Sequence, residues 1–204
     1  MNTPPRDEFR IPSGSAEAEM REKASRFIAR AYPVSKVDDV DEILGGLRKK
    51  YFDATHHCFA YRFADEFPEP GHGFDAGEPA GSAGQPILRA IHGADLWDIL
   101  IVVTRYYGGT KLGTGGLIRA YGGVAAEALS VMPVAQRILT ETLTLRCDYQ
   151  QLSVVYHVAS LTGAVPEVVG YDPEPRVAIP VRLSRIDTFR EQLTDRLGGN
   201  VRWE

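Results

Sequence analysis

Three segments of the chain have the apolar spacing of β-strands. Residues 25–32 (SRFIARAY) alternate imperfectly, and residues 57–63 (HCFAYRF) are apolar and aromatic, so both segments predict strands. Residues 98–106 (DILIVVTRY) form a continuous apolar run that is rich in β-branched residues. A run of this kind predicts a strand that is buried on both faces.

Helical spacing of apolar residues appears between these strands. Apolar residues recur at helical intervals over 37–47, and Ser35 with Asp38 forms a capping-box pattern that predicts where this helix begins. Residues 86–94 predict a short helix with Pro86 in its first turn.

A third helix is predicted after the glycines that follow residue 106. Gly122 and Gly123 interrupt its apolar face, which predicts close packing against a neighbouring element. That face consists of Leu117, Ile118, Tyr121, Val124, Ala125, Ala128 and Leu129.

A second pattern begins near residue 136 and has the order strand, helix, strand, strand, helix, strand. This order is that of the split βαβ, ferredoxin-like arrangement. We therefore expect an α+β protein of two domains, with a boundary near residues 133–138. The first half of this pattern is a strand at 137–147 and a helix at 149–161 that is capped by Asp148 and Gln151. Two strands follow at 164–172 and 176–183, around a turn at Asp172–Pro175. The last helix opens at Ser184 and Asp187 and ends at Gly198-Gly199-Asn200, and a last strand follows at 201–203.

The composition is that of an ordinary soluble globular protein. The chain has 204 residues, of which 44% are hydrophobic and 25% are charged. No apolar run is long enough to span a bilayer, and the first residues lack the basic and apolar segments of a secretory signal. The two cysteines, Cys58 and Cys147, lie far apart in strand-like segments, which predicts two buried thiols in a cytoplasmic protein and no metal site.

Charge is distributed unevenly along the chain. The net charge of −4 gives no overall preference for nucleic acid. Residues 64–85 contain five acidic residues and no Lys or Arg, whereas residues 99–126 contain Arg105, Lys111 and Arg119 and no Asp or Glu. The sequence therefore predicts one acidic and one basic loop in the same domain.

The basic segment has the composition of an anion-binding loop. Glycines allow backbone N–H groups to converge on one point, and the helix that follows adds its positive end. Neither GxxxxGK[ST] nor the full dinucleotide fingerprint is present, so a glycine-rich turn required by packing explains the pattern equally well. The predicted phosphate or nucleic-acid site consists of Arg105, Tyr106, Lys111, Gly113, Gly115, Gly116 and Arg119.

The acidic segment offers Asp75 and Glu78 to a divalent cation. The DxDxDG calcium spacing is absent, so we favour a mobile acidic loop at the surface. His56 and His57 are neighbours in a predicted strand and should point to opposite faces, which argues against a shared metal. If the two loops and residues 53–57 converge, then His56, Asp75 and Glu78 would line the cleft between them.

Four motifs together carry a resemblance to a known family. SRFIARAYPV, DATHHCFAYRF, DAGEPAGSAGQPIL and IVVTRYYGGTKLGTGGLIRAYGG, in this order and spacing, closely resemble the IMPACT family in the two-domain form of its bacterial, YigZ-like members. The resemblance implies an IMPACT-type N-terminal domain over residues 1–134. It would have the left-handed βαβ fold shared by a small-subunit ribosomal protein and domain IV of elongation factor G. It also implies a small ferredoxin-like C-terminal domain over residues 135–204.

The chain departs from the family pattern in two places. The third motif is more familiar as DDGEPSGTAG, so Ala76 replaces an acid and Ala80 replaces a hydroxyl. This departure weakens any metal or catalytic role for the loop. His57 stands where Asn is more usual, which leaves His56 as the motif histidine.

The resemblance implies a translation-related regulatory or binding protein, because eukaryotic members of the family regulate translation. We expect it to contact RNA or the ribosome through the basic loop, with Tyr106 or Tyr107 stacking on a base if exposed. One alternative is an enzyme for a small phosphorylated or nucleotide substrate, with Mg²⁺ on Asp75 or Glu78. Another is a regulator that binds a protein partner and no nucleic acid. Without a clear general base, we assign no catalytic residue and expect no cofactor, no metal and no membrane contact.

Overall fold

The computed structural model describes residues 6–171, 173–199 and 201–204. Three sequence-based expectations fall partly outside these residues. They concern Asp172, which begins the predicted turn, and Asn200, which ends the predicted helix stop. They also concern residues 1–5 of the segment that was searched for a secretory signal. No helix in the described part of the chain is long and apolar enough to cross a membrane.

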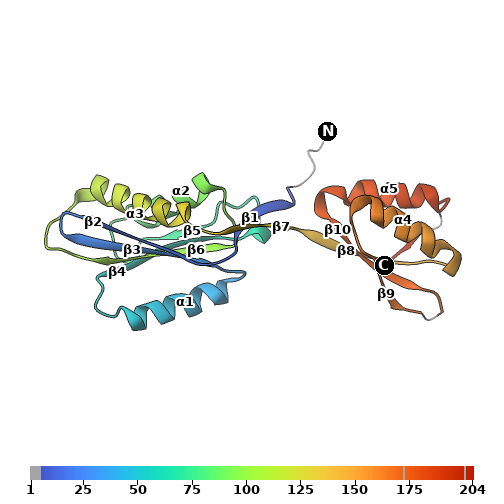
Figure 1. Ribbon diagram of the computed structural model, residues 1–204, viewed down its shortest axis with the longest axis horizontal. Coiled ribbons are helices and arrows are strands. Elements are labelled where there is room, and N and C mark those ends of the chain that lie inside the picture. Colours follow the sequence, from blue (N-terminus) through green and yellow to red (C-terminus); the bar gives the residue numbers. More distant parts are fainter. Residues whose placement is uncertain (1–5, 172, 200) are drawn as a thin grey trace. The chain divides into compact units, whose positions relative to one another are not determined.

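The chain forms two compact units (Figure 1). The N-terminal unit comprises Phe9–Arg137, and the C-terminal unit combines Ile138–Glu204 with the residues up to Glu8. The chain therefore passes from one unit to the other twice, between residues 8 and 9 and between residues 137 and 138.

The N-terminal unit is built on a five-stranded antiparallel sheet with the order β2-β3-β6-β4-β5. The central strand β6 is buried along all but its last residue. Its side chains alternate between two apolar cores, which confirms the predicted burial on both faces. The strands are β2 (Ala16–Glu22), β3 (Ser25–Pro33), β4 (His56–Arg62), β5 (His72–Phe74) and β6 (Ile99–Tyr106).

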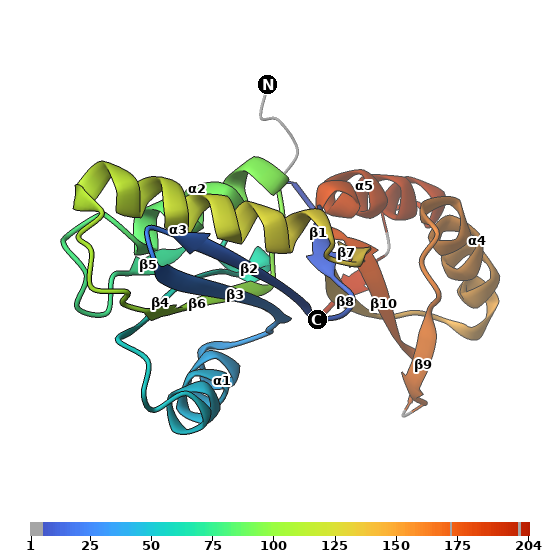
Figure 2. The same cartoon turned by 60° about the vertical axis from the view of Figure 1, so that its left-hand side comes forward.

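Three helices cover this sheet. Figures 1 and 2 show α1 (Val37–Lys50) on one face and α2 (Gly84–Ala94) with α3 (Gly113–Ser130) on the other. All three helices lie where the apolar spacing predicts them. The glycine pair of α3 packs as expected, because Gly122 faces Pro86 of α2 and Gly123 faces Met20 of β2.

The start of α1 differs from the predicted capping box by one residue. The Asp39 carboxylate, not that of Asp38, accepts hydrogen bonds from the Ser35 backbone N–H at 2.7 Å and from the Ser35 hydroxyl at 2.9 Å. It also accepts one from the Lys36 N–H at 3.2 Å. Ser35 is therefore a donor to the first turn of α1. Asp39, one position after the predicted Asp38, accepts the hydrogen bonds of the two residues that precede the helix.

Several strands were missed or merged in the sequence-based prediction. β2 (AEAEMRE) alternates exposed charged residues with half-buried Ala16, Ala18 and Met20, so its apolar signal is weak. β5 has three residues within the predicted loop. The strand predicted at 137–147 is two strands, β7 (Val134–Ile138) and β8 (Thr140–Arg146), and β7 pairs with the unpredicted β1 (Glu8–Pro12).

The C-terminal unit has the predicted ferredoxin-like topology. Its antiparallel sheet has the order β11-β8-β10-β9, and the chain order is βαββαβ. Asp148 precedes the first helix as predicted, and its N–H donates to Gln151 Oε1 at 2.9 Å. The remaining elements are α4 (Leu152–Thr162), β9 (Glu167–Gly170), β10 (Arg176–Arg182), α5 (Ile186–Arg196) and β11 (Arg202–Trp203).

Asp7 anchors the first described residues within the C-terminal unit. Its carboxylate accepts hydrogen bonds from the Arg182 guanidinium at 2.9 and 3.2 Å. It also accepts from the Ser184 N–H at 3.1 Å and from the Ser184 hydroxyl at 2.5 Å. The Ser184 side chain, which was expected to open α5, therefore donates to Asp7 instead.

We expect Asp7 to make the C-terminal unit sensitive to acid. Burial raises the pKa of Asp7, but hydrogen bonds from Arg182 and Ser184 outweigh burial and lower it from 3.8 to about 2. Because the folded pKa lies below the unfolded one, the ionised carboxylate stabilises the fold above pH 4. This contribution of about 2 kcal/mol is lost as the pH falls from about 4 to about 2.

The measurement is amide hydrogen exchange of peptides from β8 and β10, corrected for intrinsic rates, at pH 6, 4 and 3. Asp7→Asn should lower protection at pH 6 and flatten its decline at lower pH. Equal pH profiles for the variant and the wild type would contradict the assignment.

Candidate functional site

The two oppositely charged segments and the residues before β4 meet in the N-terminal unit. Register explains the meeting, because His56 at the start of β4 lies directly across from Arg105 near the end of β6. Together the segments line a cavity of about 500 Å³, which we term the loop pocket. The two loops thus lie side by side at this pocket, with His56 and Glu78 among its lining residues and Asp75 outside them. The lining residues are Thr55, His56, Glu78, Pro79, Arg105, Tyr107, Lys111, Leu112, Gly113, Thr114 and Leu117.

A buried ion pair forms one side of the loop pocket. Glu78 Oε1 accepts a hydrogen bond from Arg105 Nη1 at 2.5 Å and another from the Tyr121 hydroxyl at 2.8 Å. The Glu78 and Arg105 side chains are only 4% and 6% exposed. Arg105 Nη2 lies 3.3 Å from Ser25 Oγ. The expectation of Arg105 as a free cation is corrected, since its charge is offset by Glu78.

Asp75 supports the backbone rather than lining the loop pocket. Its carboxylate accepts hydrogen bonds from the backbone N–H groups of Gly81 at 2.7 Å and of Ala83 and Gly84 at 2.9 Å each. Burial raises the pKa of Asp75, but these three bonds outweigh burial and hold it below its usual value. The interpretation of this segment as an acidic surface loop is therefore wrong for Asp75 and for Glu78.

Protein donors already engage both carboxylates that were considered for Mg²⁺. Asp75 holds the start of α2, and Glu78 holds Arg105 and Tyr121. Within the described part of the chain, no group of three or more His, Cys, Asp or Glu side chains is placed to hold a metal ion.

The adjacent histidines diverge, as expected for neighbours in a strand. The His57 ring lies 3.2 Å from the Thr104 hydroxyl. His56 Nδ1 lies 3.0 Å from the Ala76 carbonyl oxygen, and His56 Nε2 lies 3.9 Å from Glu78 Oε1. A carbonyl oxygen can only accept, so Nδ1 carries the proton, and in the neutral ring Nε2 is an acceptor beside Glu78. His56 therefore belongs to the loop pocket and His57 does not.

Cys58 is a core residue, as its strand position predicts. It is fully buried, and its sulfur lies 2.9 Å from the Asp75 carbonyl oxygen and 3.3 Å from the Tyr121 hydroxyl. Burial raises the pKa of the Cys58 thiol to about 12. A thiol of this kind is protonated at neutral pH and is a poor nucleophile.

The free positive charge of the site comes from Lys111 and Arg119. Both are exposed, and neither forms an ion pair with any residue that the structure describes. A Cβ added at Gly115 would lie 3.6 Å from Arg119 Nη1, so the guanidinium lies over the first turn of α3. Gly113 begins this helix with a φ of +69° and no side chain caps it. Gly116 is buried against the preceding turn and serves packing.

One of the two candidate tyrosines is available for stacking. Tyr107 is 45% exposed, lines the loop pocket and donates its backbone N–H to Thr55 Oγ1 at 3.1 Å. Tyr106 is half-buried, and its hydroxyl donates to Asp53 Oδ1 at 3.2 Å. The structure therefore favours Tyr107 over Tyr106.

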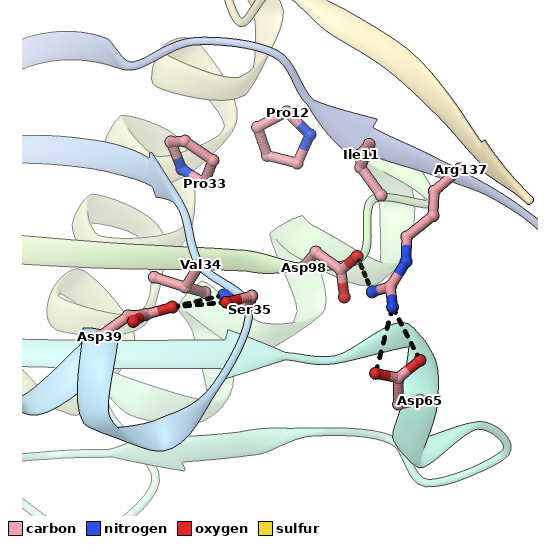
Figure 3. A pocket seen from close by; sticks show the side chains of 9 residues that line it. All are labelled: Ile11, Pro12, Pro33, Val34, Ser35, Asp39, Asp65, Asp98 and Arg137. Atoms are coloured by element: carbon pink, nitrogen blue, oxygen red, sulfur yellow. Dashed lines mark hydrogen bonds and ion pairs between the residues drawn. The ribbon is translucent and has the colours of Figure 1, made fainter. Parts of the chain in front are cut away.

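A second pocket of about 450 Å³ lies elsewhere in the N-terminal unit (Figure 3). Arg137 points between Asp98 and Asp65, with hydrogen bonds of 2.5 and 3.0 Å. Asp39 points toward Ser35 at the start of α1. Arg137, Asp98 and Asp65 are thus bonded to one another, and Asp39 is bonded to the residues before α1, so we assign all four a structural role.

Sequence reasoning missed the role of Tyr121 and the walls of the loop pocket. Tyr121 was assigned to the apolar face of α3, yet its hydroxyl bonds Glu78. The available signal was a hydroxyl on an otherwise apolar helix face. Thr55, Pro79 and Thr114 lie within the motifs that carry the family resemblance, but they were not assigned to the site, and only the structure places them on the pocket wall.

Comparison with known proteins identifies the family. The model of the Impact N-terminal domain matches residues 23–129, a range that contains the whole loop pocket. An IMPACT family member of Haemophilus influenzae is 32% identical over 195 residues, which cover 95% of each chain. The chain belongs to the IMPACT family.

Other comparisons extend the IMPACT assignment to both units. The IMPACT family member YigZ of Escherichia coli is 33% identical over 196 residues, or 94% of each chain. A crystal structure of a hypothetical protein matches 97% of each chain with a TM-score of 0.68 and 29% identity. This IMPACT chain thus has the two-domain, α+β architecture along its length.

Proposed function

We propose that the protein is a translation-related binding protein that contacts RNA or the ribosome through residues 107–119. Membership of the IMPACT family, whose eukaryotic members regulate translation, supports the first part. One observation supports the second part. Lys111 and Arg119 are exposed beside the uncapped start of α3, whereas Glu78 offsets the charge of Arg105.

The physical basis of the contact is the arrangement of positive charge around the start of α3. The first N–H groups of a helix lack intrahelical acceptors and carry partial positive charge, so they attract phosphate. Lys111 precedes this helix end, and the Arg119 guanidinium lies over it. The exposed ring of Tyr107 offers a surface on which a base can stack.

We expect the double substitution Lys111→Ala, Arg119→Ala to weaken binding to ribosomes and to a generic single-stranded RNA by about tenfold or more at low salt. It should also reduce the slope of log affinity against log salt by about 1 to 2, because fewer counterions are released. Binding is measured at several salt concentrations for the wild type and the variant.

The matched control is Lys49→Ala, Arg89→Ala, which removes the same charge from exposed positions on α1 and α2. This control should change the affinity and the salt slope much less than the Lys111→Ala, Arg119→Ala variant does. If the two double variants lose binding equally, the contact is a general charge effect and residues 107–119 are not the site. If the salt slope of the Lys111, Arg119 variant is unchanged, these two residues do not touch phosphate.

A further inference from the structure

The loop pocket has the size and the walls of a site for a small organic molecule. Its volume of about 500 Å³ falls within the range of about 300–1,000 Å³ that is usual for such sites. Pro79, Leu112 and Leu117 supply apolar surface, and Tyr107 adds an aromatic ring. A bare phosphate ion would leave this apolar lining unused.

One side of the loop pocket is suited to an anion. Lys111, Gly113 and Thr114 line it at the beginning of α3. No side chain caps this helix, and its first turn contains no acidic residue. The Lys111 side chain and the unbonded N–H groups at the start of α3 are therefore available to an anion in the same cavity.

Another side of the loop pocket is lined by Arg105 and Glu78, which are both more than nine-tenths buried. Arg105 Nε is buried and has no hydrogen-bond acceptor among the described residues. Its Nη1 and Nη2 donate to Glu78 Oε1 and Ser25 Oγ, so the guanidinium is fixed in place as one wall of the loop pocket.

The same side also presents acceptors. Both hydrogen bonds that Glu78 accepts fall on Oε1, so Oε2 receives none from the residues that the structure describes. His56 Nε2 lies 3.9 Å from Glu78 Oε1 and accepts a hydrogen bond in the neutral ring or donates one in the protonated ring. A ligand hydroxyl group, which can both donate and accept, would match Glu78 Oε2 and His56 Nε2.

We infer that the loop pocket binds one nucleotide unit, a nucleoside monophosphate that is either free or part of an RNA chain. The phosphate lies at Lys111 and the start of α3, the base lies against the apolar walls and Tyr107, and hydroxyl groups face Glu78 and His56. The inference rests on the proposed contact between residues 107–119 and phosphate, and it adds a bound base and sugar to that contact.

Thr114→Trp tests the pocket without removing either cation. Thr114 is exposed, is the second residue of α3 and lines the loop pocket, so an indole there would fill part of the cavity. The matched control is Ser153→Trp, because Ser153 is exposed and is the second residue of α4 in the C-terminal unit.

The first measurement is calorimetric titration of the whole protein with AMP, GMP, CMP and UMP, with the four nucleosides, and with inorganic phosphate. At least one nucleoside monophosphate should bind at least tenfold more tightly than its nucleoside or phosphate. Thr114→Trp should weaken this binding at least tenfold, whereas Ser153→Trp should leave it unchanged. Lys111→Ala should weaken the nucleotide more than the nucleoside.

The second measurement is binding of a short single-stranded RNA to the same two Trp variants. Weaker binding of both RNA and the nucleotide by Thr114→Trp would place a nucleotide of the RNA in the pocket, and weaker binding of the nucleotide alone would assign the pocket to a free nucleotide. The inference is overturned if no nucleoside monophosphate binds, or if Thr114→Trp binds it as the wild type does. The proposed RNA contact would still be judged separately, by the salt slope of the Lys111, Arg119 variant.

Discussion

Glu78→Ala is expected to lower the free energy of unfolding of the N-terminal unit by about 3–5 kcal/mol. The substitution leaves the Arg105 guanidinium buried without its carboxylate and removes the acceptor of the Tyr121 hydroxyl. Breaking a buried pair by removing one partner is costly, because the remaining charge is neither hydrated nor neutralised.

The measurement is urea unfolding followed by the fluorescence of Trp97, which is buried in the N-terminal unit. A Trp203→Phe background removes the other tryptophan, so the signal reports this unit alone. Glu69→Ala removes an exposed acid from the same segment and should change stability by no more than about 0.5 kcal/mol. Equal losses for Glu78→Ala and Glu69→Ala would show that the ion pair contributes little.

A double variant separates charge burial from cavity formation. Glu78→Leu with Arg105→Met removes both charges and should regain much of the stability that Glu78→Ala loses, because no unpaired ion is then buried. If the double variant is as unstable as Glu78→Ala, the loss arises from packing or from the Tyr121 hydroxyl instead.

Gly84→Ala should destabilise the N-terminal unit by about 3 kcal/mol or more, or prevent it from folding. A Cβ at this first residue of α2 would lie 2.2 Å from the Phe74 backbone nitrogen and 2.6 Å from the Gly73 carbonyl carbon. Backbone atoms of β5 cannot rotate away as a side chain can, so the helix start must move. The same movement would break the hydrogen bond from the Gly84 N–H to Asp75.

Gly93→Ala in the same helix is the matched control. Nothing lies within 4 Å of a Cβ at Gly93, and its backbone is helical. Replacing such a glycine with alanine should stabilise the unit by about 0.5–1 kcal/mol. The Trp97 fluorescence assay measures both variants, and a similar stability for Gly84→Ala and Gly93→Ala would contradict the close approach of α2 and β5.

The elements that were found from the sequence are those with a regular apolar period. The continuous run of β6 and the helical spacing of α1 and α3 each predicted an element where one lies. β2 was missed because its exposed charged residues alternate with half-buried Ala and Met, which leaves little contrast. Three-residue β5 is held by pairing with β4, a tertiary contact that a local pattern does not encode.

The candidate site was predictable in composition but not in pairing. The acid-free loop and the acidic loop are visible in the sequence, and their convergence was expected. The choice of Glu78 as the partner of Arg105, and of Asp75 as the support of α2, depends on how residues 75–83 turn. The local sequence does not show which of the two acids takes which role.

The bond between Asp7 and Arg182 also constrains the order in which the chain can fold during translation. The N-terminal unit is a continuous segment, so its residues have all been synthesised before most of the C-terminal unit. Asp7 is made first, yet Arg182 and Ser184, which it bonds, are made more than 170 residues later. Since domains generally fold as units during synthesis, the first unit can be complete on the ribosome while Asp7 is still without its partners. Closing the C-terminal unit is therefore a late step that brings Asp7 to Arg182 and Ser184.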